Sequence, residues 1–343
     1  MNYRTTELSG PTAPRCTVTA VAWVPRTLVK RSMSKPLRIV FMGSPAFAVP
    51  SLERLLADGH AIPLVVTQPD RPAGRGQGLY PPPVKVAAAR RGLPVLQPEK
   101  LSQPDVLPTL VAAQPDVIAV AAFGQFLPKA VRELPCLDCV NVHASLLPKY
   151  RGAAPIAWAL IRGETQTGVT IMRITEGMDA GPVVLQRSIP IGPEDDAGTL
   201  HDRLAELGAS ALSDALAVLA CGEGVWVPQD DAQATLAPKL RDEDCRLELA
   251  GEPAVFVNRV RGLTPAPGAY LLWGGQRLKV SRAQVSADRG PSGMILRLDG
   301  QAIVCGTGEG SVALLEVQPE GKRRMTGAEF ARGQRLQAGE RLA

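Results

Sequence analysis

The chain has 343 residues, a net charge of +5 and an ordinary composition, with 45% hydrophobic and 21% charged residues. This length predicts two domains that each bury a core. The charge excess is small for the length, so it permits a polyanionic partner without requiring one. No apolar run approaches the roughly 20 residues that a membrane-spanning helix needs. We therefore expect a soluble globular protein with no membrane partner.

The six cysteines are scattered, and their low density argues against a disulfide scaffold, so we expect a cytoplasmic protein. One CxxC motif occurs, at Cys136 and Cys139. No second pair or histidine follows at ligand spacing, so the sequence predicts no metal site. Residues 1–33 are nearly free of acidic residues. We interpret them as a disordered extension or a start assigned too early, with an organelle transit peptide as the alternative.

Alternating strands and helices are predicted from residue 37 onward. The apolar runs at residues 37–42 and 62–67 are typical of buried strands. Between them we expect a helix from Pro45 to about residue 58, with Ser44 as its N-cap. This βαβ order predicts a parallel sheet, and the absence of GxGxxG after the first strand argues against dinucleotide binding. The next elements are expected at residues 84–91 (helix), 94–97 (strand), 104–113 (helix) and 116–122 (strand).

A long loop at residues 68–83 follows the second strand, and its content of Arg, Gly and Pro predicts no regular structure. Basic residues gather in and after this loop, against the single acid Asp70: Arg71, Arg75, Lys85, Arg90 and Arg91. Two interpretations remain open. The loop is either a solvated surface excursion or a flexible basic arm that contacts a phosphate backbone.

The strand at residues 139–143 carries the strongest candidate site. Alternation places Asn141 and His143 on one face and two valines on the other. The strand ends before Pro148, at the carboxyl edge where open α/β sheets bind ligands. A single histidine near a strand end is more often structural than catalytic. Here the amide on the same face and the turn that follows favour a functional role.

Two further loops leave the predicted sheet at candidate ligand edges. Phe123 and Gly124 follow the strand at residues 116–122, and Asp179 lies in a glycine-flanked loop. Aspartates in surface loops are usually turn formers, yet this loop directly follows a strand. The elements around it are expected at residues 154–163 (helix), 168–174 (strand), 183–189 (strand) and 199–220 (a helix capped by Thr199).

The C-terminal part of the chain changes character. Residues 223–241 show little periodicity and are predicted to be a linker. From residue 242 onward, short alternating runs between turn residues predict a small antiparallel barrel. The strands are expected at residues 270–273, 277–280, 294–298, 302–305 and 312–317. From residue 251 to the end, 13 Lys and Arg stand against 8 Asp and Glu, an excess that suits nucleic acid.

Asn141, His143 and Asp179 would supply an amide, an imidazole and a carboxylate. The sequence contains no GxSxG-type nucleophile elbow, so direct transfer between two bound substrates fits better than covalent catalysis. In such a transfer an amine attacks a carbonyl carbon, and the Asn and His stabilise the developing oxyanion. The carboxylate orients the His or removes the amine's proton through water.

Four segments carry a resemblance to a known family: TQPDRPAGRG at residues 67–76, NVHASLLPKYRGAAPI at 141–156, TGVTIM at 167–172 and AELG at 205–208. With them the chain from residue 37 to its C-terminus resembles the folate-dependent formyltransferases. The basic segment at residues 67–76 narrows the resemblance to the methionyl-tRNA formyltransferase branch. One departure is Phe123, which stands where relatives often carry Tyr.

The resemblance implies a Rossmann-like catalytic domain at residues 34–222 and an OB-like, tRNA-binding β-barrel at residues 242–343. It implies 10-formyltetrahydrofolate as the formyl donor and the α-amine of methionyl initiator tRNA as the formyl acceptor. The protein is expected to be a monomer that binds the acceptor stem of the tRNA. The implied catalytic residues are Asn141, His143 and Asp179. The implied folate-binding residues are Phe123, Gly124, Ser145, Leu146, Leu147 and Pro148. The implied tRNA-binding residues are Arg71, Arg75 and Lys85.

Three alternatives stay open at the level of sequence. The first two are a formyltransferase acting on a small amine such as glycinamide ribonucleotide, and a formyltetrahydrofolate hydrolase. The basic loop and the C-terminal barrel argue against both. The third is a noncatalytic RNA-binding protein, which both basic regions would suit. The presence of Asn141, His143 and Asp179 argues against it.

Overall fold

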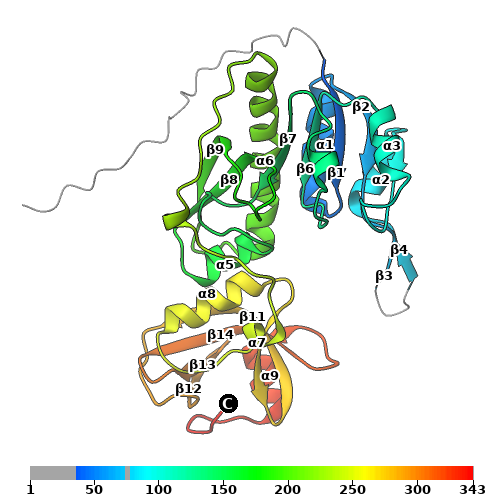
Figure 1. Cartoon of the computed structure of the whole chain (residues 1–343). Coiled ribbons are helices and arrows are strands. Elements are labelled where there is room, and N and C mark those ends of the chain that lie inside the picture. The colour runs from blue at the N-terminus through cyan, green and yellow to red at the C-terminus, as the bar shows by residue number, and fades with distance from the viewer. Residues whose placement is uncertain (1–35, 74–77, 343) are drawn as a thin grey trace, which may run out of the picture. The chain divides into compact units, whose positions relative to one another are not determined.

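The structure, a computed structural model, describes residues 36–73 and 78–342 (Figure 1). The predictions for residues 1–33 therefore lie outside the described residues. A seven-stranded sheet with the order β5-β2-β1-β6-β7-β8-β9 organises the N-terminal part. Its strands are β1 (Arg38–Gly43), β2 (Ala61–Val66), β5 (Val95–Leu96), β6 (Val117–Ala121), β7 (Asp138–His143), β8 (Gln166–Arg173) and β9 (Val183–Pro190).

The first five strands in this order pair in parallel, and β8 and β9 pair antiparallel with their neighbours. The predicted Rossmann-like, mainly parallel sheet is confirmed, with its last two strands reversed. β8 runs back along β7 because the chain between them stays near the carboxyl end of β7. The side-chain hydroxyl of Thr170 on β8 donates to the carbonyl of Ser145, two residues beyond β7 (2.7 Å).

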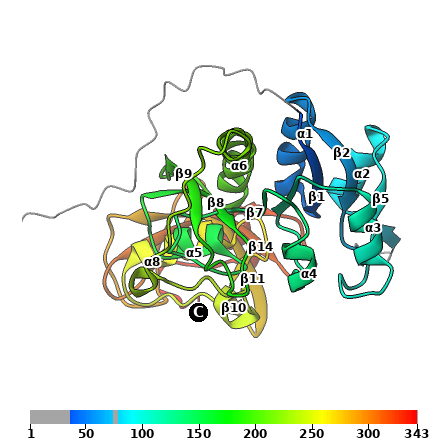
Figure 2. The ribbon, with the colours of Figure 1, turned by 45° about the horizontal axis from the view of Figure 1, so that its top comes forward.

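Helices cover both faces of this sheet, which explains why its parallel strands are almost fully buried. The helical elements are η1 (Ala46–Ala48), α1 (Val49–Ala57), α2 (Pro83–Arg90), α3 (Val106–Ala112), α4 (Lys129–Arg132), α5 (Pro155–Ile161) and α6 (Ala197–Ala220). α1 and α6 contact each other, and α6 packs on β7 and β8 (Figure 2). The approach is close at Gly208, where a Cβ would lie 2.8 Å from a methyl group of Val142.

The opposite face buries a second set of side chains, which position the candidate site. Residues of β1, β2, β6 and β7 pack there against α3 and α4: Val40, Met42, Val66, Ile118, Val120, Cys139, Val106, Leu110 and Val131. Because side chains alternate along a strand, Asn141 and His143 share the face of Cys139. They extend that face beyond the apolar core, at the carboxyl end of β7.

The C-terminal part forms a separate antiparallel sheet with the order β10-β11-β14-β13-β12, and β15 pairs with β14. Its elements are α7 (Asp242–Cys245), α8 (Pro253–Leu263), β10 (Ala269–Trp273), β11 (Gln276–Ser286), β12 (Ile295–Leu298), β13 (Ile303–Gly306), β14 (Ser311–Pro319), β15 (Met325–Thr326) and α9 (Gly327–Gln334). The sheet buries one core together with Phe256 of α8 and Phe330 of α9. All five strands predicted from alternation are present. The helices α7, α8 and α9 were not predicted from the sequence.

Three local predictions are wrong. Ser44 is not an N-cap, because its hydroxyl accepts from the backbone of Gln68 (3.0 Å) and so joins the ends of β1 and β2. Asp196, not Thr199, caps α6, and Thr199 is the third-position partner in the capping box. The loop at residues 68–83 is not wholly irregular, since β3 (Arg71–Ala73) and β4 (Gly78–Tyr80) pair as a short antiparallel hairpin.

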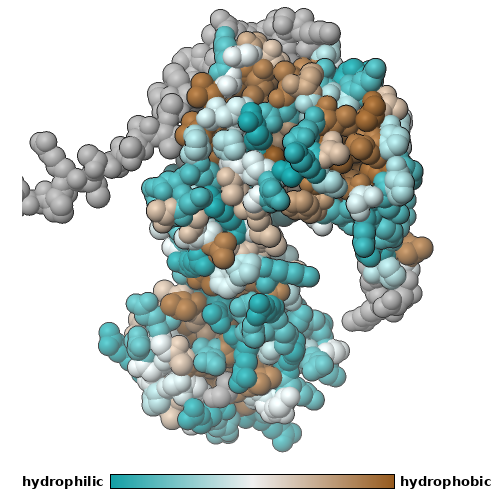
Figure 3. Space-filling view, in the orientation of Figure 1, coloured by the Kyte–Doolittle hydropathy of each residue, from teal (hydrophilic) through white to brown (hydrophobic). Residues whose placement is uncertain are grey.

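Hydrophilic residues predominate over the C-terminal sheet domain on the face shown in Figure 3. Within the described residues, no helix combines the length and the apolar character that crossing a membrane requires.

Candidate active site

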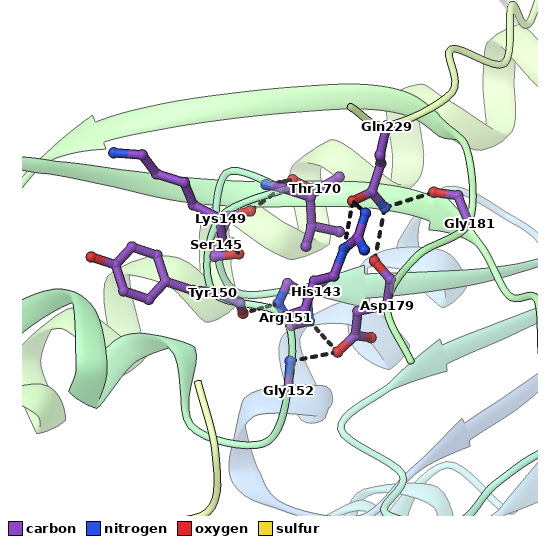
Figure 4. A network of polar contacts seen from close by, with 11 residues as sticks. His143, Ser145, Lys149, Tyr150, Arg151, Gly152, Thr170, Asp179, Gly181 and Gln229 are labelled. Carbon is purple, nitrogen blue, oxygen red and sulfur yellow. Dashed lines mark hydrogen bonds and ion pairs between the residues drawn. The ribbon is translucent and has the colours of Figure 1, made fainter. Parts of the chain in front are cut away.

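His143 is held at the end of β7 by a contact with the loop that follows. Its side chain is 5% exposed, and its Nε2 lies 2.9 Å from the carbonyl oxygen of Tyr150 (Figure 4). A carbonyl oxygen can only accept, so Nε2 carries the hydrogen and donates it. The other ring nitrogen, Nδ1, lies 3.6 Å from Oδ2 of Asp179, beyond hydrogen-bonding distance. Nδ1 is therefore the ring atom that a substrate can reach.

Asp179 faces His143 from the loop between β8 and β9, so the structure brings these two predicted residues together. Its Oδ2 accepts a hydrogen bond from the backbone N–H of Gly152 (2.9 Å), whereas Oδ1 has no partner within the described residues. The carboxylate thus uses one oxygen as an anchor and presents the other. Its side chain is 18% exposed.

Asn141 lies two residues before His143 on the same face of β7 and is half-buried. In the described part of the chain its side-chain amide has no hydrogen-bond partner. An amide N–H that the protein leaves unpaired beside an imidazole and a carboxylate can donate to a substrate oxygen. The three predicted catalytic residues therefore supply a donor, a ring nitrogen and a carboxylate oxygen near the carboxyl edge of the sheet.

Tyr150, whose carbonyl holds His143, is itself fixed. Its hydroxyl donates to Oε1 of Glu164 (2.7 Å), and its backbone N–H donates to the hydroxyl of Thr235 (2.9 Å). Burial, reinforced by Glu164, raises the pKa of Tyr150 to about 12, so the phenol is uncharged at neutral pH. Tyr150 thus acts as a rigid support for the histidine through its backbone.

The turn predicted to contact folate, Ser145 to Pro148, is tied to β8 and β9 by side chains. The hydroxyl of Thr170 donates to Ser145 and accepts from the N–H of Leu147 (3.1 Å). The side-chain amide of Gln186 donates to the carbonyl of Leu147 (2.7 Å) and to the same hydroxyl (2.9 Å). These contacts fix the backbone of the turn directly beside the catalytic strand.

Phe123 and Gly124 follow β6, the strand next to β7. The ring of Phe123 is 2% exposed and belongs to the core cluster, so only its backbone reaches the sheet edge. Its carbonyl accepts from the side-chain amide of Gln68 (3.1 Å). Gly124 is exposed and has a φ of 81°, a conformation that favours glycine. Any ligand contact by Phe123 would therefore be made by the backbone.

Of the predicted tRNA-binding residues, Arg71 lies in β3 and Lys85 in α2, after the β3–β4 hairpin. Arg71 is largely exposed and makes one long ion pair with Glu99 (3.6 Å). Lys85 is held by both carboxylate oxygens of Asp70 (2.8 and 2.7 Å). Hydrogen bonds from Gln97 and then Lys85 lower the pKa of Asp70, so this carboxylate remains ionised at neutral pH. Arg75 lies outside the described residues.

The sequence analysis missed four residues that shape the site: Arg151, Thr170, Gln186 and Gln229. Periodicity does not mark their roles, since each acts through hydrogen bonds to residues distant in the chain. Thr170 is the nearest to a detectable signal, because it is a buried polar residue in a strand and such a group needs a partner. Among the described residues, no group of three or more His, Cys, Asp or Glu side chains could hold a metal ion.

Solved structures with the same fold include two that contain a bound folate. HypX from Aquifex aeolicus in complex with tetrahydrofolic acid matches with a TM-score of 0.61 and 19% identity, over 87% of this chain and 47% of that one. An N-formyltransferase from Helicobacter canadensis in complex with folinic acid and dTDP-3-aminofucose matches with a TM-score of 0.61 and 15% identity, over 81% of this chain and 99% of that one. At these identities the likeness establishes the fold.

Sequence comparison establishes the family. Residues 37–216 match the formyl transferase family model and residues 239–335 match the model of the formyl transferase C-terminal domain. A methionyl-tRNA formyltransferase from Geobacter sulfurreducens is 48% identical over 89% of this chain and 96% of its own length. A methionyl-tRNA formyltransferase from Solibacter usitatus is 47% identical over 89% of this chain and 98% of its own length. The chain therefore belongs to the methionyl-tRNA formyltransferase family and is a formyl group transferase.

Proposed function

We propose that this enzyme transfers the formyl group of 10-formyltetrahydrofolate to the α-amine of methionyl initiator tRNA. The observation that carries the proposal is the pairing of His143 Nδ1 with Asp179 Oδ2 at 3.6 Å. The other carboxylate oxygen of Asp179 and the side-chain amide of Asn141 have no protein partner within the described residues. Relatives named methionyl-tRNA formyltransferase, at 48% identity, support methionyl-tRNA as the acceptor.

The proposed chemistry is a direct attack of the amine nitrogen on the formyl carbon. The amide of Asn141 donates to the formyl oxygen as negative charge develops there, and Nδ1 of His143, when protonated, donates to the same oxygen. Oδ1 of Asp179 receives the amine's proton, directly or through a water molecule. The bond between the formyl carbon and N10 of the donor then breaks, and the proton passes to that nitrogen.

The residues after β6 and β7 fit a bound folate. The turn at residues 145–148 has its backbone fixed by Thr170 and Gln186, so polar backbone groups can meet a pterin without reordering. The exposed Gly124 adds a backbone without a side chain at the adjacent strand end. We therefore propose Phe123, Gly124 and the turn Ser145, Leu146, Leu147 and Pro148 as the folate-binding set, with Phe123 contributing its backbone.

The tRNA is proposed to bind through charges outside the catalytic centre. Arg71 is exposed and only weakly paired, so its guanidinium can exchange Glu99 for a phosphate. Arg75 lies in the same basic segment. Lys85 adds positive charge to this region while it remains bonded to Asp70. We propose that this segment contacts the acceptor stem.

The proposed division of the chain is a catalytic domain at residues 34–222, a linker at 223–241 and a tRNA-binding domain at 242–343. We propose a monomer that works in the cytoplasm. Support for a reducing compartment comes from the described cysteines, all of which are free: Cys136, Cys139, Cys221, Cys245 and Cys305.

The test is formyl transfer by the purified protein with 10-formyltetrahydrofolate and methionyl initiator tRNA. Uncharged tRNA and glycinamide ribonucleotide serve as control acceptors, and we expect no product from either. His143→Ala should lower kcat by at least about a hundredfold, because it removes both the oxyanion donor and the partner of Asp179. Binding of tRNA, measured by filter retention, should change little. Parent turnover in His143→Ala, or transfer to glycinamide ribonucleotide, would contradict the proposal.

A further inference from the structure

The segment at residues 226–237, which the sequence predicts as part of a linker, contacts both loops that carry the active site. At one end, Val227 exchanges two backbone hydrogen bonds with Val183 at the start of β9, both 2.8 Å. At the other end, Arg151 donates to the carbonyl of Thr235 (2.8 Å) and accepts from the N–H of Ala237 (2.7 Å). The segment therefore connects the loop after β7 to the loop before β9.

Gln229 lies in the middle of this segment and uses its entire side-chain amide. Its Oε1 accepts from Nε and Nη2 of Arg151 (3.0 and 2.8 Å). Its Nε2 donates to the carbonyl oxygens of Asp179 (2.8 Å) and Gly181 (2.7 Å). Figure 4 shows Gln229 between Arg151 and the loop that carries Asp179 and Gly181. Arginine can only donate and carbonyls can only accept, so the amide has a single orientation that satisfies all four bonds.

The backbone that Gln229 holds is in an unfavourable conformation. Asp179 has a φ of 48°, in the left-handed region that costs a non-glycine residue about 1 kcal/mol. Such a conformation persists only where the surroundings impose it. The two carbonyls bonded by Gln229 belong to Asp179 itself and to Gly181. Among the described residues, the one hydrogen bond to the carboxylate comes from the N–H of Gly152.

We propose that Gln229 is a positioning residue, which holds the loop at Asp179 so that its carboxylate faces Nδ1 of His143. The guanidinium of Arg151 orients the side-chain amide of Gln229. The backbone of Arg151 bonds to the segment at residues 226–237. Gly152, the next residue, completes the arrangement, because its N–H anchors Asp179 and a Cβ there would lie 2.6 Å from the carbonyl of Ala237. Asp231 also bonds Arg151, but its side chain is 82% exposed and the contact is screened by solvent.

This inference rests on the proposed catalytic role of Asp179, and two substitutions test it. Gln229→Glu has the same shape and keeps an acceptor for Arg151, but it points an oxygen at two carbonyls in place of an N–H. Gln229→Leu removes all four bonds. We expect both to lower kcat by roughly ten- to hundredfold, because a small displacement of a catalytic group costs about that much. The KM values for folate and for methionyl initiator tRNA should stay within about twofold.

Gln233 provides the matched control, because it lies in the same segment, is exposed and bonds only the neighbouring Asp230 (2.8 Å). Gln233→Glu and Gln233→Leu should keep the parent kcat. Thermal unfolding of every variant shows whether a lower kcat reflects a displaced Asp179 carboxylate or an unfolded protein. If Gln229→Leu does not fold, the isosteric Gln229→Glu decides. Parent kcat in Gln229→Glu, or a loss that lies entirely in KM, overturns the proposal.

A double substitution separates this inference from the proposed function. If Gln229 acts through the carboxylate, Gln229→Glu should lower the residual kcat of Asp179→Asn by less than about twofold, since the two effects are then not additive. Full additivity would show that Gln229 acts elsewhere and would overturn the inference. Parent kcat in Asp179→Asn would instead refute the proposed function. An impaired Asp179→Asn beside an unimpaired Gln229→Glu would refute only the role of Gln229.

Discussion

Asp179 combines a backbone conformation that few non-glycine residues adopt with a carboxylate whose two oxygens differ. Oδ2 is bonded to Gly152, and Oδ1 has no partner within the described residues. The same division holds for His143, whose Nε2 is bonded to the carbonyl of Tyr150 while Nδ1 faces Asp179. At the residue scale, Asp179 and His143 are therefore each anchored by one atom and present another. This arrangement fixes geometry without consuming the reactive atom.

A second histidine, His60, predicts pH-dependent stability away from the active site. It is 5% exposed, its Nδ1 accepts from the backbone of Leu37 (3.2 Å), and its Nε2 has no partner among the described residues. Burial lowers the pKa of His60, although Asp58 opposes the shift. The unfolded chain therefore binds more protons below about pH 6.5, and the folded state loses stability as pH falls through that value.

The measurement is urea unfolding at pH 7.5 and pH 5.5. On going to the lower pH, the free energy of unfolding of the parent should fall by up to about 1.4 kcal/mol per pH unit more than that of His60→Asn. The amide oxygen of this variant can accept from the N–H of Leu37 but does not titrate. His201→Asn is the control, because His201 is partly exposed and packs only against the edge of Phe47 and Asp202. Equal pH dependence in the parent and His60→Asn would contradict the prediction.

At the element scale, β8 organises the site although it contributes no proposed catalytic residue. Thr170 pairs with His143 in the antiparallel register, and its hydroxyl holds the turn that follows β7. The fit of β8 against β9 is close, since a Cβ at Gly168 would lie 2.0 Å from the carbonyl of Arg187. β8 thus fixes the turn relative to the catalytic face of β7.

Thr170→Val tests this role, because it keeps the shape of the side chain and removes the hydroxyl. The carbonyl of Ser145 and the N–H of Leu147 would lose their partner in a fully buried place, which costs about 1 to 3 kcal/mol of stability. If the loss of these contacts weakens folate binding by the same energy, KM for folate should rise by roughly fivefold to 150-fold, with a smaller change in KM for tRNA. Thr167→Val, a buried threonine at the other end of β8, is the control. Equal folate KM values for the two variants would argue against the role of Thr170.

At the scale of the whole molecule, helix packing joins the two sheets. α8 packs on α5, and at Gly262 an added Cβ would lie 2.6 Å from Ile161 and 2.7 Å from the carbonyl of Ala157. Arg261 donates to the carbonyl of Asp195 (2.7 Å), just before α6. The domain at residues 242–343, which we propose to bind tRNA, therefore packs directly against the proposed catalytic domain.

Salt dependence tests the proposed tRNA contacts. Between 50 and 200 mM salt, KM for tRNA should rise at least about tenfold, because phosphate contacts release counterions, while KM for folate should change by less than about threefold. The double substitution Arg71→Ala and Arg75→Ala should raise KM for tRNA and reduce its salt dependence. Arg54→Ala is the control, because it also removes an arginine, here from an ion pair with Asp58. An unchanged salt slope in the double variant would exclude the hairpin from tRNA binding.

The sequence by itself determined the two-domain fold class, most strand positions and the face that Asn141 and His143 share. These features follow from local periodicity, since a strand buried on both sides is apolar throughout and a strand's side chains alternate. The resemblance on residues 141–156 supplied the chemistry. The helices of the C-terminal domain escaped because the partners that bury them lie on strands elsewhere in the chain.

Only the tertiary structure decided how the site is supported. Gln229 contacts residues 48 and 50 positions before it, and it lies in a segment with no periodicity to mark it. Thr170 bonds a turn more than 20 residues earlier in the chain. Likewise, nothing in the sequence TEGMDAG fixes the left-handed conformation of Asp179, because hydrogen bonds from another segment hold it. Periodicity reports which face a residue occupies, whereas the partner of a single polar atom is set by the packing of the whole chain.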